Sequence, residues 1–222
     1  GEVATEIARK HALELVMTAT LKSINLNHID QTNESDLNLL ARLAKQNGAE
    51  MAVKKDRLLI FQAGTAKSAS GQNIPAITLT RNDGDHFRYN EQDRESDYTG
   101  VSASYQDLGK ATRKRVTSGN PEKRSGGNDP TTKTKVIKGT FANKEEAQRA
   151  TDAKMAEIKR KMAKFSINLA LGMPEISTES PVKLDRFKTE IDQLKWIVEK
   201  ATHTYSKSNG LITQLELESN LN

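Results

Sequence analysis

The chain has 222 residues, with 34 Lys and Arg against 29 Asp and Glu and a net charge of +5. At this length it can bury a sizeable core, and the absence of cysteine excludes disulfides, thiolate metal sites and thiol catalysis. No apolar run reaches the roughly 18 residues of a membrane-spanning helix, and the first residues lack the apolar core of a signal peptide, so we expect neither.

The first 64 residues predict a small α+β module that begins with two helices. Apolar residues at helical spacing favour a helix over residues 3–13, and the leucines of residues 33–48 repeat at intervals of three and four. Asn33 and Asp36 can accept hydrogen bonds from the first free amides of this second helix, and Asn47-Gly48 is a typical C-terminal stop.

A hairpin and a linker follow the helices. Two apolar runs, residues 49–53 and 58–61, are separated by a polar stretch, as in a hairpin. Residues 65–73 are small and polar, which is typical of a linker. We therefore predict a domain boundary there, with a second domain over residues 74–222.

The sequence of the second domain predicts mainly β-strands. Alternating or apolar runs at residues 74–80, 98–108 and 133–140 predict strands, and Asn82-Asp83-Gly84 predicts a turn. Shorter runs further along, at residues 166–172 and 179–188, predict more strands separated by turn residues. Many short strands of this kind favour an antiparallel β-barrel or sandwich, and we predict a barrel.

A basic stretch interrupts these strands. Gly, Ser, Asn and Pro around it predict a flexible loop near residues 110–133. A cluster of cations over residues 110–124 could contact phosphates, but no aromatic residue alternates with them as a stacking platform requires. We favour a solvated loop and keep a weak interaction site, whose candidate residues are Arg113, Lys114, Arg115, Lys123 and Arg124.

One helix is predicted inside the β region, over residues 143–165. Asn143 and Glu146 form a capping pair at its start, and an apolar stripe ends at Phe165. Two methionines of this helix lie on the stripe, so we interpret them as core residues and not as ligands.

The closing stretch, residues 196–218, combines the only tryptophan with a histidine and several hydroxyls. Alternation places Trp196, Val198, Lys200 and Thr202 on one strand face, and the leucines after the turn share one face. We interpret the stretch as a hairpin in which His203 is a cross-strand partner; a chemical role for His203 is the less favoured alternative.

No catalytic or cofactor site can be assigned. The four histidines are far apart in sequence and none belongs to a metal-binding pair. The chain contains no nucleotide-binding or nucleophile-elbow motif. We therefore expect no catalytic residue, metal or cofactor.

Three separated segments resemble the phage late control protein D family, the baseplate hub proteins of contractile tails. They are SDLNLLARLAKQNGAEMAVKKDRLLIFQAG (residues 35–64), NKEEAQRATDAKMAEIKRK (residues 143–161) and SPVKLDRFKTEIDQLKWIVEKATHTYSKSNGLITQLELE (residues 180–218). The family is similar in fold to the hub part of type VI secretion spike proteins. Its members usually carry about another hundred residues upstream, which hold a first barrel, so the resemblance also suggests a C-terminal fragment.

The resemblance implies a structural role in the virion, at the tail baseplate, after assembly in the host bacterial cytoplasm. Expected partners are other copies of the chain in a trimer, the tail spike, the tail tube, tape-measure and other baseplate proteins, with no membrane anchor and no specific nucleic acid. As a fragment with one barrel, the chain is expected to be monomeric. Two alternatives remain: a nucleic-acid-binding protein that uses residues 110–124, and a cell-wall hydrolase, which the missing catalytic constellation disfavours.

Overall fold

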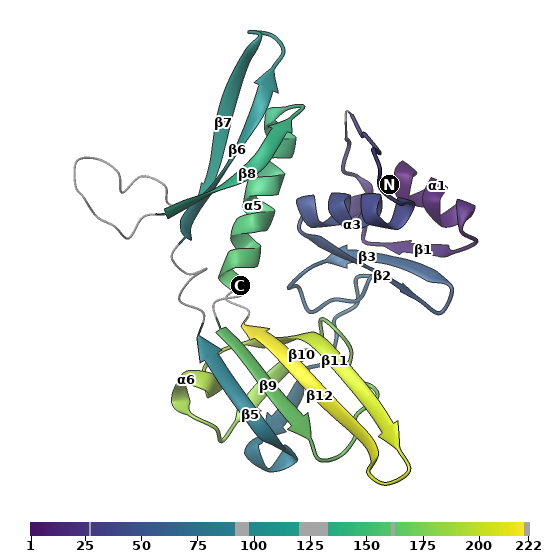
Figure 1. Ribbon diagram of the computed structural model, residues 1–222, viewed down its shortest axis with the longest axis vertical. Coiled ribbons are helices and arrows are strands. Elements are labelled where there is room, and N and C mark those ends of the chain that lie inside the picture. Colours follow the sequence, from purple (N-terminus) through teal and green to yellow (C-terminus); the bar gives the residue numbers. More distant parts are fainter. Residues whose placement is uncertain (27, 92–97, 120–132, 161–162, 220–222) are drawn as a thin grey trace, which may run out of the picture. The chain divides into compact units, whose positions relative to one another are not determined.

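The computed structural model describes residues 1–26, 28–91, 98–119, 133–160 and 163–219. The chain is an α+β protein dominated by sheet, as predicted. None of the helices in these ranges is long and apolar enough to cross a membrane. The chain divides into two compact units (Figure 1). The first holds Gly1–Ala63, Ala69–Gly71 and Asp97–Ile158, and the second holds Gly64–Ser68, Gln72–Ser96 and Lys159–Asn222.

The N-terminal part of the first unit packs helices on a three-stranded sheet. Its elements are α1 (Glu2–Lys10), β1 (Glu14–Met17), α2 (Ala19–Lys22), α3 (Asp36–Gln46), β2 (Ala49–Lys54) and β3 (Arg57–Gln62). The strand order is β1-β3-β2, with β1 parallel and β2 antiparallel to β3. The core includes Leu39 and Leu40 of α3 and Leu58 and Ile60 of β3.

Both predicted helices and the hairpin are present, but the predicted cap of α3 is wrong. Ser35 is the N-cap, and its Oγ accepts a hydrogen bond from the Asn38 amide at 3.2 Å. The predicted stop is confirmed, since Asn47 is the C-cap and Gly48 has φ +68°. The hairpin turns at Lys55-Asp56, both with positive φ, as a two-residue type I′ turn requires. Strand β1 was not predicted because four residues carry too little periodicity.

The rest of the first unit is a second three-stranded sheet with one long helix. Its elements are β6 (Tyr98–Asp107), β7 (Thr112–Gly119), β8 (Lys133–Phe141) and α5 (Lys144–Arg160), and the strand order is β7-β6-β8. In Figure 1 α5 lies along one face of this sheet. Ala103 and Val116 pack against Ala147 of α5 in a small core. These alanines leave room for the helix to approach the sheet closely.

Two predictions about this region need correction. Residues Thr112–Gly119 form strand β7 and not a flexible loop, because they pair with β6 over eight register positions; residues 120–132 lie outside the described ranges. Helix α5 starts at its predicted cap, where the Glu146 amide donates to Asn143 Oδ1 at 2.8 Å. It ends at Arg160, so Phe165 belongs to a strand and not to the helical stripe.

The second unit is built on a six-stranded sheet. Its elements are β4 (Ile77–Thr80), η1 (Arg81–Asp83), β5 (Gly84–Glu91), β9 (Ala163–Leu169), β10 (Pro181–Asp185), α6 (Thr189–Asp192), β11 (Trp196–Ser206) and β12 (Gly210–Ser219). The strand order is β4-β10-β11-β12-β9-β5. All neighbours are antiparallel except β4 and β10, which are parallel. The predicted purely antiparallel arrangement is therefore wrong.

This sheet must curl. Its edge strands β4 and β5 are joined by the three residues of η1, and the chain from Thr80 to Gly84 can span at most about 15 Å. A flat sheet of six strands would hold its edges roughly 24 Å apart. The observed sheet is a curled half-barrel, and among the described residues β4 and β5 share no ladder that would close it.

The concave core of the second unit is aromatic. Phe165 lies at its centre, with ring centroids 5.8 Å from Trp196, 5.1 Å from Phe187 and 6.2 Å from Phe87. Trp196 is 1% exposed, and its indole Nε1 donates to the Ile191 carbonyl oxygen at 2.9 Å. The one tryptophan is thus fully buried and fully hydrogen-bonded.

The units do not follow the predicted domain boundary. Residues 97–158, which were expected in the second domain, cluster with the N-terminal module, so the inserted helix belongs to the first unit. The predicted linker at residues 65–73 contains an antiparallel bridge between Lys67 and Asn73. The prediction assumed that each domain is continuous in sequence, whereas the first unit is built from separate segments of the chain.

Candidate interaction surfaces

The described residues contain no group of three or more His, Asp or Glu that could hold a metal ion. Three of the histidines each lie beside one aspartate: His11 beside Asp36 at 2.9 Å, His28 beside Asp30 at 3.0 Å and His86 beside Asp85 at 2.8 Å. One carboxylate beside one imidazole provides neither a ligand set nor a nucleophile.

His203 is a cross-strand partner, as predicted. Its Nε2 lies 3.1 Å from the Ile176 carbonyl oxygen, which can only accept, so Nε2 carries the proton. Its Nδ1 lies within hydrogen-bond distance of Thr213 Oγ1, at 2.9 Å. Thr213 Oγ1 in turn accepts from the Met173 amide at 2.9 Å. Both ring nitrogens are thus engaged in holding the loop after β9 on the β11–β12 hairpin.

The predicted face assignment of β11 is correct only at its start. A bulge lies between Val198 and Lys200, so Ala201, opposite Leu215, follows Trp196 and Val198 on the core face. The expected leucine face of β12 is confirmed, with Leu215 and Leu217 at most 1% exposed. A bulge adds one residue and reverses the alternation, which explains why neither face looked purely apolar.

One end of the second unit carries exposed apolar side chains. Leu171 is 80% exposed and Tyr205 is 75% exposed. The register aligns Tyr205 with Leu211, and a side chain at Gly172 would collide with Leu211 Cγ. Leu171, Leu211 and Tyr205 therefore form an apolar row across the strand ends, called the rim row below. Exposed large side chains that gather in this way are typical of contact surfaces.

The structure describes only three of the five residues of the predicted basic site. Arg113, Lys114 and Arg115 are consecutive on β7, whereas Lys123 and Arg124 lie outside the described residues. Lys114 Nζ donates to Asp107 Oδ2 at 2.5 Å. This contact lowers the pKa of the Asp107 carboxyl and raises the pKa of the Lys114 ammonium. Arg113 and Arg115 point to the other side of the strand and are exposed.

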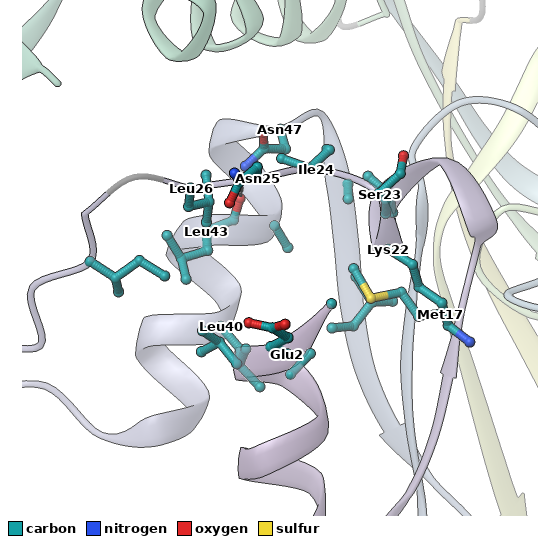
Figure 2. A pocket seen from close by; sticks show the side chains of 18 residues that line it. Glu2, Met17, Lys22, Ser23, Ile24, Asn25, Leu26, Leu40, Leu43 and Asn47 are labelled. Carbon is teal, nitrogen blue, oxygen red and sulfur yellow. Dashed lines mark hydrogen bonds between the residues drawn. The ribbon is translucent and has the colours of Figure 1, made fainter. Parts of the chain in front are cut away.

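A cavity of about 410 Å³ lies in the N-terminal module. Figure 2 shows Leu40 and Leu43 of α3 on one side and Met17 and Lys22 on another. Most of its lining is apolar, and Glu2 and Lys22 are its charged lining residues. It lies on the helical face of the module, where the N-terminal residues meet α3, and its residues offer no constellation for chemistry.

Sequence reasoning missed the rim row and the outer face of β6. The signal for the latter was present, because Val101, Ser102, Ala103 and Ser104 alternate apolar and hydroxyl side chains. Such alternation indicates one face on a core and one face turned away from it. The rim row had no sequence signal, since only the strand register aligns its members.

Residues 1–209 match the phage tail baseplate hub (GPD) family. Two curated relatives, the probable baseplate hub proteins of Escherichia phages 186 and P2, are each 36% identical over 98% of this chain. The chain spans 64% of the length of these relatives.

Solved structures show the same fold. A tail protein from Neisseria meningitidis MC58 matches 98% of this chain and 64% of its own, with a TM-score of 0.66 and 16% identity. The 43 kDa tail protein of prophage MuSo2 from Shewanella oneidensis matches 97% and 63%, with a TM-score of 0.65 and 14% identity. At such identities the likeness concerns the fold alone. The match over residues 1–209 is what decides the family: this chain belongs to the phage tail baseplate hub family.

Proposed function

We propose that this chain is a structural part of a baseplate hub in the contractile tail of a phage or prophage, and that it acts without catalysis. The observation that carries the proposal is the family match over residues 1–209, together with two relatives named as probable baseplate hub proteins. The site geometry supports it, because the described polar clusters serve packing and strand pairing.

The curled sheet of the second unit is the element that we assign to the tube-like part of the hub. Its two edge strands, β4 and β5, are joined through η1, and we assign barrel closure in the assembled hub to these two edges. Three copies of the whole hub protein would form a ring between the tail tube and the central spike. The partners are then further copies of the hub, the spike, the tube, the tape-measure protein and other baseplate proteins.

The rim row suits a contact within such a ring. In a threefold ring each subunit joins two different patches, so a contact surface need not be self-complementary. Leu171 and Tyr205 are large, apolar and exposed at a strand end, where they can insert into a neighbouring subunit. The location that follows is the virion baseplate, with assembly in the host bacterial cytoplasm.

A premature stop codon within this chain, placed in the phage or prophage that carries it, tests the proposal. Induced lysates are examined by negative-stain electron microscopy. We expect tails without an assembled baseplate and restoration by the hub gene supplied in trans. Normal baseplates in the truncated phage would rule the hub function out.

Native mass spectrometry tests the assembly. The present chain alone is expected to be monomeric, because it spans only 64% of the length of its hub relatives. The whole hub protein mixed with its spike is expected to give a complex with three copies of each. A stable trimer of the present chain would overturn the first expectation, and a one-to-one complex would overturn the second.

A further inference from the structure

The charge of the chain is concentrated on one sheet. The described residues from Tyr98 to Gly119 and from Lys133 to Phe141 hold seven Lys or Arg and one acid, Asp107, whereas the whole chain has a net charge of only +5. Lys114 is paired with Asp107. Among the described residues Arg113, Arg115 and Lys138 have no ion-pair partner. Unpaired cations this close together repel one another, so the sheet favours an anionic neighbour.

Hydroxyl and basic side chains lie on the face of this sheet opposite α5. Ala103 and Val116 point to α5, so strand alternation turns Ser102, Ser104 and Arg115 to the other face. Ser104 lies opposite Arg115 on β7, and Ser102 lies between Thr117 and Val136. This face, with small hydroxyl side chains on the central strand and longer side chains on both flanking strands, is called the serine trough below.

One hydroxyl on this face is buried and has no partner among the described residues. Ser102 is 1% exposed, and its Oγ makes no hydrogen bond with any described residue. A buried polar group left unpaired costs free energy. Beside it Val136 is 57% exposed although it is apolar and lies opposite Ser102. The exposed Val136 side chain would gain from a ligand that brings an apolar group to this face.

We propose that the serine trough binds an extended acidic segment of a partner protein. Arg113 and Arg115 are two residues apart on one strand, so their side chains leave the same face about 7 Å apart. Carboxylates at alternate positions of an extended chain have the same spacing. Guanidinium groups bind carboxylates through paired hydrogen bonds. The apolar side chain of such a segment would lie on Val136.

The composition of the trough favours an acidic polypeptide over nucleic acid. Single-stranded nucleic acid binds on aromatic side chains that stack with bases, and the middle of the trough carries serines. Of the tyrosines of β6, Tyr105 packs on the α5 core, and Tyr98 has the Lys135 ammonium 5.2 Å from its ring centroid. The inference rests on the proposed hub function only for the expectation that the partner is another tail protein.

The test measures binding of a fluorescein-labelled peptide of alternating glutamate and valine to the full chain by fluorescence anisotropy. The double variant Arg113→Gln/Arg115→Gln removes the paired cations, and Val136→Ser removes the apolar contact without a change of charge. Arg88→Gln/Lys183→Gln is the charge-matched control, since both residues are exposed on strands of the second unit. Circular dichroism and the Trp196 emission check that every variant is folded.

We expect saturable binding that Arg113→Gln/Arg115→Gln weakens at least about tenfold, because two charge-assisted contacts are lost. Val136→Ser is expected to weaken it about threefold, as the loss of one small apolar contact does, and the control variant to leave it unchanged. A peptide in which glutamine replaces glutamate should not bind.

Three results would overturn the proposal. One is the absence of saturable peptide binding, and another is an equal loss in the control variant, which would mean that net charge alone acts. The third is tighter binding of labelled oligodeoxythymidine than of the peptide with the same dependence on Arg113 and Arg115, which would assign the face to nucleic acid. Failure of the hub function in the phage experiment would leave the peptide result intact, so the two failures can be told apart.

Discussion

The sheet of the second unit and the β7-β6-β8 sheet of the first use their two faces in different ways. The six-stranded sheet curls around Phe165 and Trp196, so its largest side chains lie inside. The three-stranded sheet carries Ala103 and Val116 against α5 and serines and arginines on its other face. The six-stranded sheet therefore buries its large aromatic side chains in its own core. The three-stranded sheet has only a small core with α5, and its other face is the one that we propose binds a partner.

The two regions can be followed separately in one sample. The chain has a single tryptophan, Trp196, which lies in the second unit, so its emission reports on that unit. Helices α1 and α3 and nearly all of α5 lie in the first unit, so the helical circular dichroism band reports mainly on the first unit.

The largest effect is expected for Trp196→Ala. Removal of a fully buried aromatic side chain and of its hydrogen bond to Ile191 should lower the free energy of unfolding of the second unit by about 3–5 kcal/mol. Differential scanning calorimetry measures it, since the variant lacks the fluorophore. Trp196→Phe should lose less, and an unchanged transition in Trp196→Ala would contradict the assignment of the core.

A smaller effect is expected where the sheet of the first unit meets its helix. Ala103 is 0% exposed and packs with Ala147, so Ala103→Leu overfills the contact and should destabilise the first unit by about 1–3 kcal/mol. The helical band should melt earlier while the Trp196 emission transition stays in place. Thr117→Leu, on the opposite and exposed face, is the control and should change little.

Two buried serines should respond differently to replacement by alanine. Ser219 Oγ donates to the Arg160 carbonyl oxygen at 3.0 Å and accepts from the Ala163 amide at 3.1 Å, so Ser219→Ala should cost about 1–3 kcal/mol. Ser102 Oγ has no partner among the described residues, so Ser102→Ala should be neutral or stabilise by about 1 kcal/mol. Urea unfolding followed by tryptophan emission measures the effect of Ser219→Ala. Urea unfolding followed by the helical circular dichroism band measures the effect of Ser102→Ala. Destabilisation by Ser102→Ala would mean that Ser102 Oγ already has a hydrogen-bond partner.

The smallest effect concerns the ion pair at the end of the three-stranded sheet. Lys114 holds the pKa of Asp107 below its usual value, so the carboxylate contributes stability above its unfolded pKa of about 4, and this contribution is lost as the pH falls below that value. Asp107 raises the pKa of Lys114, so the lysine contribution is lost only at strongly alkaline pH. The melting temperature of the helical band is measured from neutral to acidic pH. Asp107→Asn should flatten this dependence slightly, and an equal slope in both proteins would show that the pair has no effect.

Local signals were enough to predict many of the elements. Helix α3 carries its leucine period and its Asn47-Gly48 stop, α5 carries the Asn143–Glu146 cap, and the last hairpin carries its leucine alternation. Residues close in sequence interact in these elements, so the chain specifies them locally. The helix end at Arg160 was harder, because the apolar spacing continues into β9 through Phe165.

The surfaces were predicted only in part. Arg113 and Arg115 were recognised as candidates from charge, but Gly, Ser and Pro near them suggested a loop, and only pairing with β6 makes them a strand. The partnerless Ser102 and the rim row of Leu171, Leu211 and Tyr205 depend on strand register. Strand register depends on pairing between segments far apart in the chain, so it is difficult to predict from a single sequence.

The sequence by itself determined the α+β class, the main helices and hairpins, and the resemblance to the hub family, because each rests on periodicity, caps and local motifs. Only the tertiary structure decided that residues 97–158 join the N-terminal module, that β4 and β10 are parallel and that β4 and β5 are the two edges of a curled sheet. The physical reason is that these features come from pairing between segments far apart in the chain. Their free energy is shared among many partners, so no single segment carries a signal for it.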